Sequence, residues 1–291
     1  MPVVQEQKDQ DNAAYVRRVH DKGLQFDLRT MSRRRLLAAF GGAGALALVG
    51  GVAACDSTAE EATGTTGDLT EVESETAGPF PADGSNGPDV RTEQGIVRKD
   101  IRPSYGDASG TAEGVPLEFS LVVTDLDGAA VTGAAVYAWH CDREGNYSLY
   151  SSGVTDQNYL RGIQETDSTG KVSFTSIFPA CYSGRWPHIH FEVYSSLVNA
   201  TSGDGPIVKT SQIALPSTAA DAVYATDGYS RSVSNLSQVS LATDTVFGDD
   251  SAATELATVT GSVTDGYLAT LTIAIDGGAP GSAPPSRTAA S

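Results

Sequence analysis

The stretch His188-Ile-His-Phe-Glu-Val-Tyr194 follows a Ser-Gly turn and reads as a short β-strand. Its two histidines stand at positions i and i+2. Successive side chains of a strand point to opposite faces of the sheet, so both imidazoles are expected on the same face. The stretch therefore predicts a strand that carries a pair of imidazoles side by side.

Other stretches of the chain read as strands of the same kind. Leu117–Thr124 alternates apolar and polar residues and ends at the turn Asp125-Leu-Asp-Gly128. The remaining predicted strands are 135–141, 171–177, 208–215 and 266–275. Only 217–226 and 233–241 have weak helical character. Short strands separated by turn signals predict an all-β fold, a single β-sandwich domain.

Composition sets the expected boundaries of that domain. Residues 56–72 are rich in Thr, Glu, Gly and Ser, and predict a disordered linker. The tail 277–291 is expected to be disordered as well. The β-sandwich is therefore assigned to residues 73–276, and residues 1–55 form an N-terminal extension with a signal.

Residues 31–55 have the pattern of an export signal. Three arginines at 33–35 precede an apolar, Gly/Ala-rich run, which ends in Val52-Ala-Ala-Cys55. The arginines resemble a twin-arginine signal, and the small residues before Cys55 resemble a lipoprotein processing box. The alternative is a membrane-spanning helix, which the glycines of the run disfavour. We expect an exported protein, on the outer face of the cytoplasmic membrane through a lipidated Cys55 or extracellular, with Met31 as a second possible start.

Charge narrows the class of partner. Residues 56–291 hold 11 basic and 31 acidic residues, a net charge of −20. Nucleic-acid binding rests on Lys and Arg contacts to phosphate, so nucleic acid is not an expected partner. The acidity fits solubility outside the cell. Cys141 and Cys181 could form a disulfide there or remain two buried free thiols, and the sequence leaves both open.

Beyond residue 55 the chain has three histidines, His140, His188 and His190. Imidazole is the commonest protein ligand for metals, so the pair at 188 and 190 indicates a metal site, with a chance surface pair as the alternative. Tyr182 lies six residues before His188. Tyrosines more often pack than bind metals, so composition alone does not single one out.

Three ordered blocks carry a resemblance. They are Trp139-His-Cys-Asp-Arg-Glu-Gly-Asn-Tyr147-Ser, the stretch 159–174, and Ile177-Phe-Pro-Ala-Cys-Tyr182-Ser-Gly-Arg185-Trp-Pro-His188-Ile-His190-Phe. Together they resemble the intradiol ring-cleavage dioxygenases, which include catechol and protocatechuate dioxygenases. Thr76–Phe80 and Asp100–Pro103 resemble that family's opening segment. The resemblance spans roughly residues 74–215.

The resemblance implies roles for individual residues. Tyr147 matches the equatorial tyrosinate ligand of the metal, and Tyr182 the axial tyrosinate that leaves when substrate binds. His188 and His190 match the two histidine ligands. Arg185 matches the active-site arginine, with a surface ion pair as its alternative, and Gln212 matches a glutamine that supports the ligands. His140 is unmatched, and we expect it to be packed or at the surface.

Two departures from the family pattern leave the substrate and the oligomeric state open. The family's Tyr-Pro-Trp is Tyr182-Ser-Gly here, and the chain shows no N-terminal helical region. The ligand set implies Fe(III) as cofactor, because two phenolates stabilise a strongly charged cation. Zinc, which favours Cys, His and carboxylate, is the alternative metal.

The implied function is cleavage of a catechol-type ring between its two hydroxyls with both atoms of O2. The product is a cis,cis-muconate-type diacid. One alternative is an extracytoplasmic β-sandwich module that binds aromatic or carbohydrate ligands without turnover. Another is a metal-storage or adhesion lipoprotein, for which Arg185 and Gln212 have no evident use.

Overall fold

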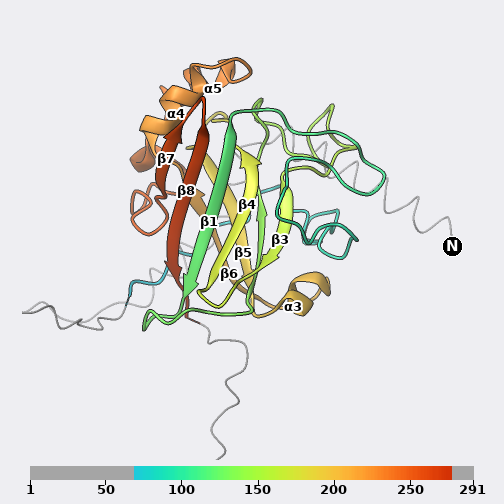
Figure 1. Cartoon of the computed structure of the whole chain (residues 1–291). Helices are drawn as coiled ribbons and strands as arrows, with labels where there is room; N and C mark the ends of the chain where they lie inside the picture. The colour runs from blue at the N-terminus through green and yellow to red at the C-terminus, as the bar shows by residue number, and fades with distance from the viewer. Residues whose placement is uncertain (1–68, 277–291) are drawn as a thin grey trace, which may run out of the picture.

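A computed structural model describes residues 69–276. The predicted signal with Cys55, most of the predicted linker and the predicted tail lie outside these residues. The described part has eight strands and three short α-helices (Figure 1). The strands are β1 Pro116–Thr124, β2 Ala135–Trp139, β3 Arg161–Glu165, β4 Lys171–Ile177, β5 His188–Tyr194, β6 Ile207–Ala214, β7 Thr258–Ser262 and β8 Gly266–Ala274. The helices are α3 Leu197–Thr201, α4 Ser217–Tyr224 and α5 Ser230–Leu236, with a 3-10 turn at Leu241–Thr243.

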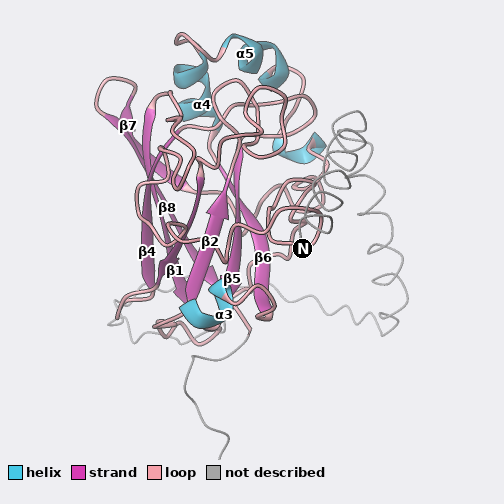
Figure 2. Ribbon diagram, turned by 90° about the vertical axis from the view of Figure 1, so that its right-hand side faces the viewer, coloured by secondary structure: helices cyan, strands magenta, loops and turns pink. Residues whose placement is uncertain are grey.

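The strands form two four-stranded sheets, ordered β4-β1-β8-β7 and β3-β2-β5-β6, which Figure 1 shows as two layers. This confirms the predicted β-sandwich. Pairing is antiparallel except between β1 and β8, which run parallel. Figure 2 shows α4 and α5 at one end of the sandwich and α3 at the other.

Alternation along β5 fixes what each of its faces contacts. Ile189, Phe191 and Val193 are fully buried in the core between the sheets, together with residues such as Phe119 of β1. The residues between them, including both histidines, point to the opposite face of their sheet. That face is also covered, so all seven residues of β5 are buried.

The stretch around Phe80, which precedes the first strand, covers that second face. The buried guanidinium of Arg161 on β3 donates to the carbonyl oxygens of Phe80 and Pro81, at 3.0 Å in each case. The Tyr137 hydroxyl of β2 donates to the Pro81 carbonyl at 2.7 Å. These bonds hold the stretch around Phe80 over the sheet, and they create a second apolar cluster beside the histidines.

Two strands lack the alternation that predicted the others. β3 contains Gly162, where an added Cβ would lie 2.5 Å from Ile101 Cγ2, so close packing requires glycine there. β7 is largely exposed and contains Gly261 at a φ of 116°. The predicted helix at 233–241 lies earlier, as α5 at Ser230–Leu236.

Both cysteines that had a disulfide as one possibility are free thiols. Cys141 and Cys181 are buried, and the Cys181 thiol donates to the Arg185 carbonyl at 3.3 Å. Burial raises the pKa of both thiols. His140 is packed as expected, with its Nε2 2.7 Å from the Ser176 hydroxyl.

The start of the described chain already contacts the sandwich. Residues 69–72 were assigned to the linker, but the Val72 amide donates to the Ala274 carbonyl at 2.9 Å and Val72 is buried. Between residues 69 and 276 there is no helix with the length and apolar character needed to cross a membrane.

Candidate metal centre

The two histidines of β5 form the base of the site. Trp139, the last residue of β2, pairs in register with His190, and the two rings stack with centroids 5.0 Å apart and an interplanar angle of 2°. His188 Nδ1 lies 2.5 Å from the Trp186 carbonyl, which requires the hydrogen on Nδ1. The Nε2 atom of His188 therefore presents a lone pair toward the site.

Tyr147 reaches the histidines because a tight turn follows β2. The Asp142 carboxylate accepts from the amides of Glu144 and Asn146, at 3.0 and 2.8 Å. Gly145 within that turn has a φ of 91°, a conformation that glycine adopts without strain. The turn reverses the chain, and the Tyr147 ring returns over the sheet as a buried side chain.

Tyr182 comes from the loop that leads into β5. The Arg185 amide donates to the Tyr182 carbonyl at 3.2 Å, and Gly184 has a φ of 80°. This tight turn folds Tyr182 back toward His188. Its side chain is half-buried, whereas Tyr147 is only 3% exposed.

Four donor atoms converge from these three segments. Around the ring, Tyr147 Oη lies 3.4 Å from Tyr182 Oη, and Tyr182 Oη lies 3.1 Å from His188 Nε2. His188 Nε2 lies 3.2 Å from His190 Nε2, which lies 3.2 Å from Tyr147 Oη. The structure thus brings together all four residues that the sequence singled out as ligands.

Burial favours the neutral form of Tyr147, His188 and His190. Burial, followed by the cationic Arg185, lowers the pKa of both histidines well below its usual value. Burial, followed by the neighbouring Tyr182, raises the pKa of Tyr147 well above its usual value. A multivalent cation at the centre of the ring would reverse this for the tyrosine, because it stabilises the phenolate.

The ring has the size that a metal ion requires. Metal bonds to nitrogen and oxygen of about 2.0–2.2 Å, at angles of roughly 90–110° between ligands, separate neighbouring donors by about 3.0–3.5 Å. The four separations here, 3.1–3.4 Å, lie in that range. Among residues 69–276 no group of three or more His, Cys, Asp and Glu side chains is placed to hold a metal, so the two tyrosines are what complete the set.

Arg185 and Gln212 lie at the edge of the ring. The Arg185 guanidinium is 1% exposed; its Nη2 donates to Gln212 Oε1 at 2.6 Å, and its Nη1 lies 3.5 Å from His188 Nε2. Gln212 pairs in register with His190 across β5 and β6, and its amide donates to the Thr76 carbonyl at 2.9 Å. Both predicted residues are therefore beside the four donors.

Comparison with known proteins agrees with this geometry. Residues 87–192, which contain the four donors and Arg185, match the Dioxygenase_C family model, described as "Dioxygenase". Part of the chain is 38% identical over 66 residues to a chlorocatechol 1,2-dioxygenase of Rhodococcus opacus, covering 23% of this chain and 26% of that protein. Part of the chain is thus similar to known dioxygenases.

A second curated protein and a solved structure are also similar to this chain. A catechol 1,2-dioxygenase 2 of Acinetobacter lwoffii is 38% identical over 74 residues, 25% of this chain and 26% of that protein. The matched segments thus span about a quarter of these two curated proteins. A solved intradiol ring-cleavage dioxygenase from Tetranychus urticae superposes with a TM-score of 0.56 at 23% identity, over 73% of this chain and 96% of that one. The two-sheet sandwich is therefore of the intradiol dioxygenase type.

One residue of this site was missed by the sequence analysis. The buried Asp244 carboxylate accepts from Arg185 Nε at 3.0 Å and from the Trp186 amide at 2.6 Å. It also accepts from the amides of Val246 and Phe247, at 2.7 and 2.9 Å. Asp244 lies 59 residues after Arg185, in a loop outside the family match, so the sequence offered no local signal for its role.

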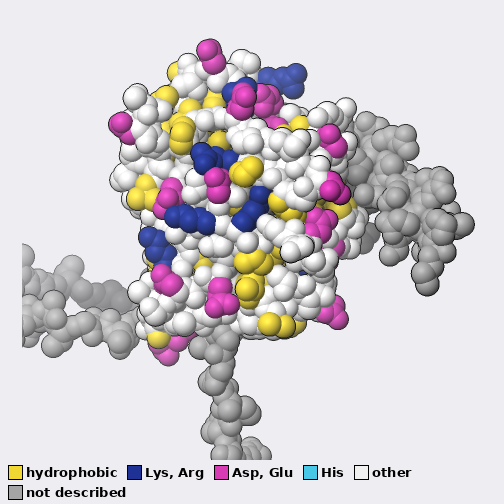
Figure 3. Space-filling model, turned by 45° about the vertical axis from the view of Figure 1, so that its right-hand side comes forward, with side chains coloured by type: hydrophobic (Ala, Val, Ile, Leu, Met, Phe, Trp, Pro, Cys, Tyr) yellow, Lys and Arg dark blue, Asp and Glu magenta, His cyan; other side chains and the backbone are white. Residues whose placement is uncertain are grey.

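Gly78 is a second missed residue. Its φ is 70°, and an added Cβ would lie 3.2 Å from His190 Cε1. The sequence marked Thr76–Phe80 as family-like but gave no reason for its glycine. None of the site histidines is exposed: His188 and His190 are each 2% exposed, and Figure 3 shows no histidine on the face that it displays.

Proposed function

We propose that this domain is a non-haem Fe(III) intradiol dioxygenase, which cleaves a catechol-type ring between its two hydroxyls with both atoms of O2. The product is a cis,cis-muconate-type diacid. The observation that carries the proposal is the ring of Tyr147, Tyr182, His188 and His190 with neighbouring donors 3.1–3.4 Å apart. The fold and the family match support the same assignment.

The donor set favours ferric iron over other metals. Two phenolates and two neutral imidazoles supply two negative charges from hard oxygen atoms, which suits Fe(III). Zinc sites favour Cys, His and carboxylate ligands instead. Ferrous oxygenases use two histidines and one carboxylate. When bound, Fe(III) would hold the catechol through its oxygens and make the ring reactive toward O2.

Tyr182 has the position of a proton acceptor. Its side chain is half-buried, on a loop turned by Gly184, whereas the other three donors are buried on or against the sheet. A catechol has two hydroxyl protons to lose on binding. In this proposal one of them moves to Tyr182 Oη and the other to solvent, and Tyr182 turns away from the site to make room for the substrate.

Arg185 supplies fixed positive charge at the reacting centre. Asp244 and Gln212 orient the guanidinium, which is 1% exposed. A buried charge held in place by hydrogen bonds needs little reorganisation when negative charge develops on the substrate. Arg185 is thus assigned the role of stabilising the substrate's negative charge. The Asp244 carboxylate prevents the guanidinium from standing buried without a counter-ion.

Export of this enzyme is also proposed, on the signal pattern of residues 31–55 alone. Lipidation of Cys55 would anchor the domain to the outer face of the membrane through the predicted linker. Expression of the full chain in a bacterium with a lipoprotein pathway tests this. The wild type should sediment with membranes and Cys55→Ala should be soluble, and equal distribution of the two would contradict it.

Oxygen uptake is the test of the proposed reaction. Iron-loaded full-length protein should consume one O2 per catechol and release a diacid with no other oxidant present. Tyr147→Phe and His190→Ala should abolish uptake, whereas Tyr267→Phe on the opposite sheet should retain it. Catechol binding without O2 uptake would instead identify a binding module, and full activity in either ligand variant would reject that ligand.

A further inference from the structure

Beside the metal centre lies a second pocket of about 390 Å³. Its floor continues the same face of the sheet, because Glu192 follows His190 by two residues on β5 and pairs with Thr210 of β6. Its wall is the stretch Glu73–Gly78, and Gly78 also packs against His190. The volume is within the range of small-molecule sites, roughly 300–1,000 Å³.

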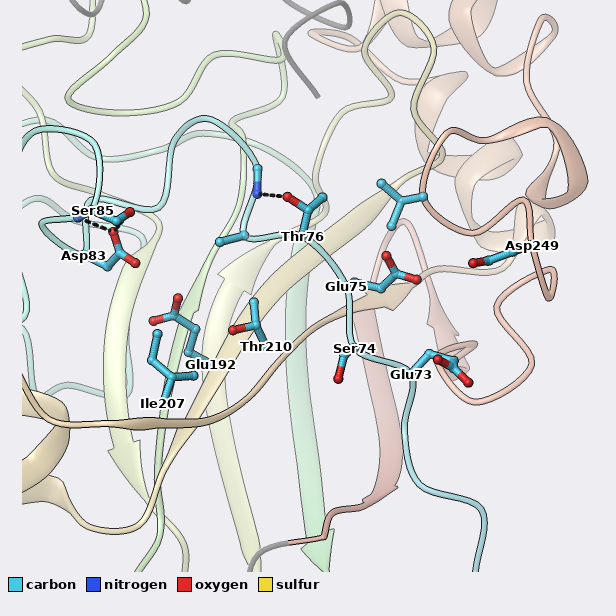
Figure 4. Close-up of a pocket in the computed structure, with 13 residues that line it drawn as sticks. Glu73, Ser74, Glu75, Thr76, Asp83, Ser85, Glu192, Ile207, Thr210 and Asp249 are labelled. Carbon is cyan, nitrogen blue, oxygen red and sulfur yellow. Dashed lines mark hydrogen bonds between the residues drawn. The ribbon is translucent and has the colours of Figure 1, made fainter. Parts of the chain in front are cut away.

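The charged residues that line this pocket are all acidic. Figure 4 shows Asp83 and Glu192 facing each other at one end, and Glu75 facing Asp249 at the other, with Glu73 nearby. We call Asp83 and Glu192 the first acidic pair, and Glu75 and Asp249 the second acidic pair. Neither Lys nor Arg lines the pocket.

One of these carboxylates is buried with unused hydrogen-bonding capacity. Glu192 is fully buried, and while its Oε2 accepts from the Tyr194 hydroxyl at 2.6 Å, its Oε1 has no hydrogen-bond partner among the described residues. Glu75 of the second acidic pair is 8% exposed. Burying an unpaired carboxylate is costly, so such groups are normally paired or bind a cation.

The nearby cations each make their hydrogen bonds and ion pairs with groups other than the pocket carboxylates. Arg91 donates to Asp89, to the Tyr194 hydroxyl and to two backbone carbonyls. Lys209 pairs with Glu71 and donates to Ser74. Arg185 is held by Asp244 and Gln212. Accordingly, burial, followed by Asp249, raises the pKa of Glu75 to about 8.

The two acidic pairs fit an organic cation with two separated positive charges better than a metal ion. The described residues contain no group of three or more carboxylates, histidines or cysteines placed to hold a metal. The acidic pairs stand at opposite ends of the pocket, and apolar side chains of Ala77, Ile207 and Val246 contribute to its walls. Acidic groups at both ends of one pocket match an aliphatic chain that carries an ammonium at each end.

We propose that this pocket binds an aliphatic diamine or polyamine, with one ammonium on the first acidic pair and the other on the second. The Thr210 hydroxyl lines the pocket beside the first pair. This site is separate from the metal centre, and its occupation requires neither iron nor turnover.

Calorimetric titration of the purified full-length protein with cadaverine tests the proposal. One molecule should bind per chain, at least about tenfold more tightly than n-butylamine, since the monoamine can engage only one pair. Glu192→Gln and Glu75→Gln should each weaken cadaverine binding about tenfold or more. Both substitutions preserve the shape of the side chain and replace a carboxyl group whose burial raises its pKa, so they should not impair folding.

Asp221→Asn is the matched control, because it removes one charge from an exposed position of α4 outside the pocket. It should leave cadaverine affinity unchanged. Equal weakening in Asp221→Asn would mean diffuse attraction to an acidic protein and overturn the proposal. So would equal affinity for the monoamine, the absence of cadaverine binding, or binding of Ca²⁺ or Mn²⁺ in its place.

Discussion

Substitution of Asp244 by Asn tests how the active-site arginine is held. The Asp244 carboxylate and the Arg185 guanidinium are 0% and 1% exposed, and the carboxylate also accepts three backbone amides. Asn keeps the volume but removes the charge and turns one acceptor into a donor that faces Arg185 or the Trp186 amide. Breaking a buried pair by removal of one partner costs about 3–5 kcal/mol.

Urea denaturation of the metal-free proteins measures this cost. Asp244→Asn should lower the free energy of unfolding by about 3–5 kcal/mol. The melting temperature should fall by roughly 6–20 °C for a domain of this size. Asp100→Asn is the control, because its ion pair with Arg102 has side chains 43% and 39% exposed; its loss should cost at most about 1 kcal/mol. Equal costs for the two variants would refute the buried-pair argument.

Further predictions concern the ligands and buried carboxylates. Gly78→Ala should weaken metal binding about 10–100-fold in chelator competition, because its Cβ would press on His190. Gly106→Ala has a similar φ of 67° with nothing within 4 Å, so it should keep the affinity, and equal losses would reject the contact. Burial, followed by Glu75, raises the folded-state pKa of Glu255 to about 9 from 4.5, so its contribution to stability is full below about pH 4.5 and is lost as the pH rises through 9. The unfolding free energy should therefore fall by up to about 1.4 kcal/mol per pH unit in that window; Glu255→Gln should flatten this dependence in urea titrations, and an unchanged slope would contradict it.

The sequence predicted the sandwich because most strands carry their signal locally. Period-two alternation and turn residues identified β1 and β5, since each has one face in the core between the sheets. β3 and β7 were not predicted from the sequence, because their extended conformation depends on the strands with which they pair. In β3, Gly162 packs closely against Ile101, and β7 is largely exposed. Tertiary pairing, rather than propensity, holds these two strands in place.

In the candidate site, too, some features follow from local sequence and others depend on distant parts of the chain. The histidines share one face of a strand, which is a local property, and the two tyrosines were identified only through their spacing in family-like blocks. Asp244 approaches Arg185 from 59 residues away. No local pattern encodes that contact, nor the meeting of Glu75 with Asp249 across the second pocket, because both depend on how distant loops fold over the sheet.

The visible absorption spectrum of the iron-loaded protein tests the central claim most directly. If Tyr147 and Tyr182 are both ligands, one Fe(III) per chain should give a burgundy protein with a broad tyrosinate-to-iron charge-transfer band. The band should shift when catechol is added. It should weaken and shift in Tyr147→Phe, because only Tyr182 then remains as a phenolate ligand, but not in Tyr267→Phe. A protein that binds no iron and stays colourless, or a band unchanged in Tyr147→Phe, would contradict the account.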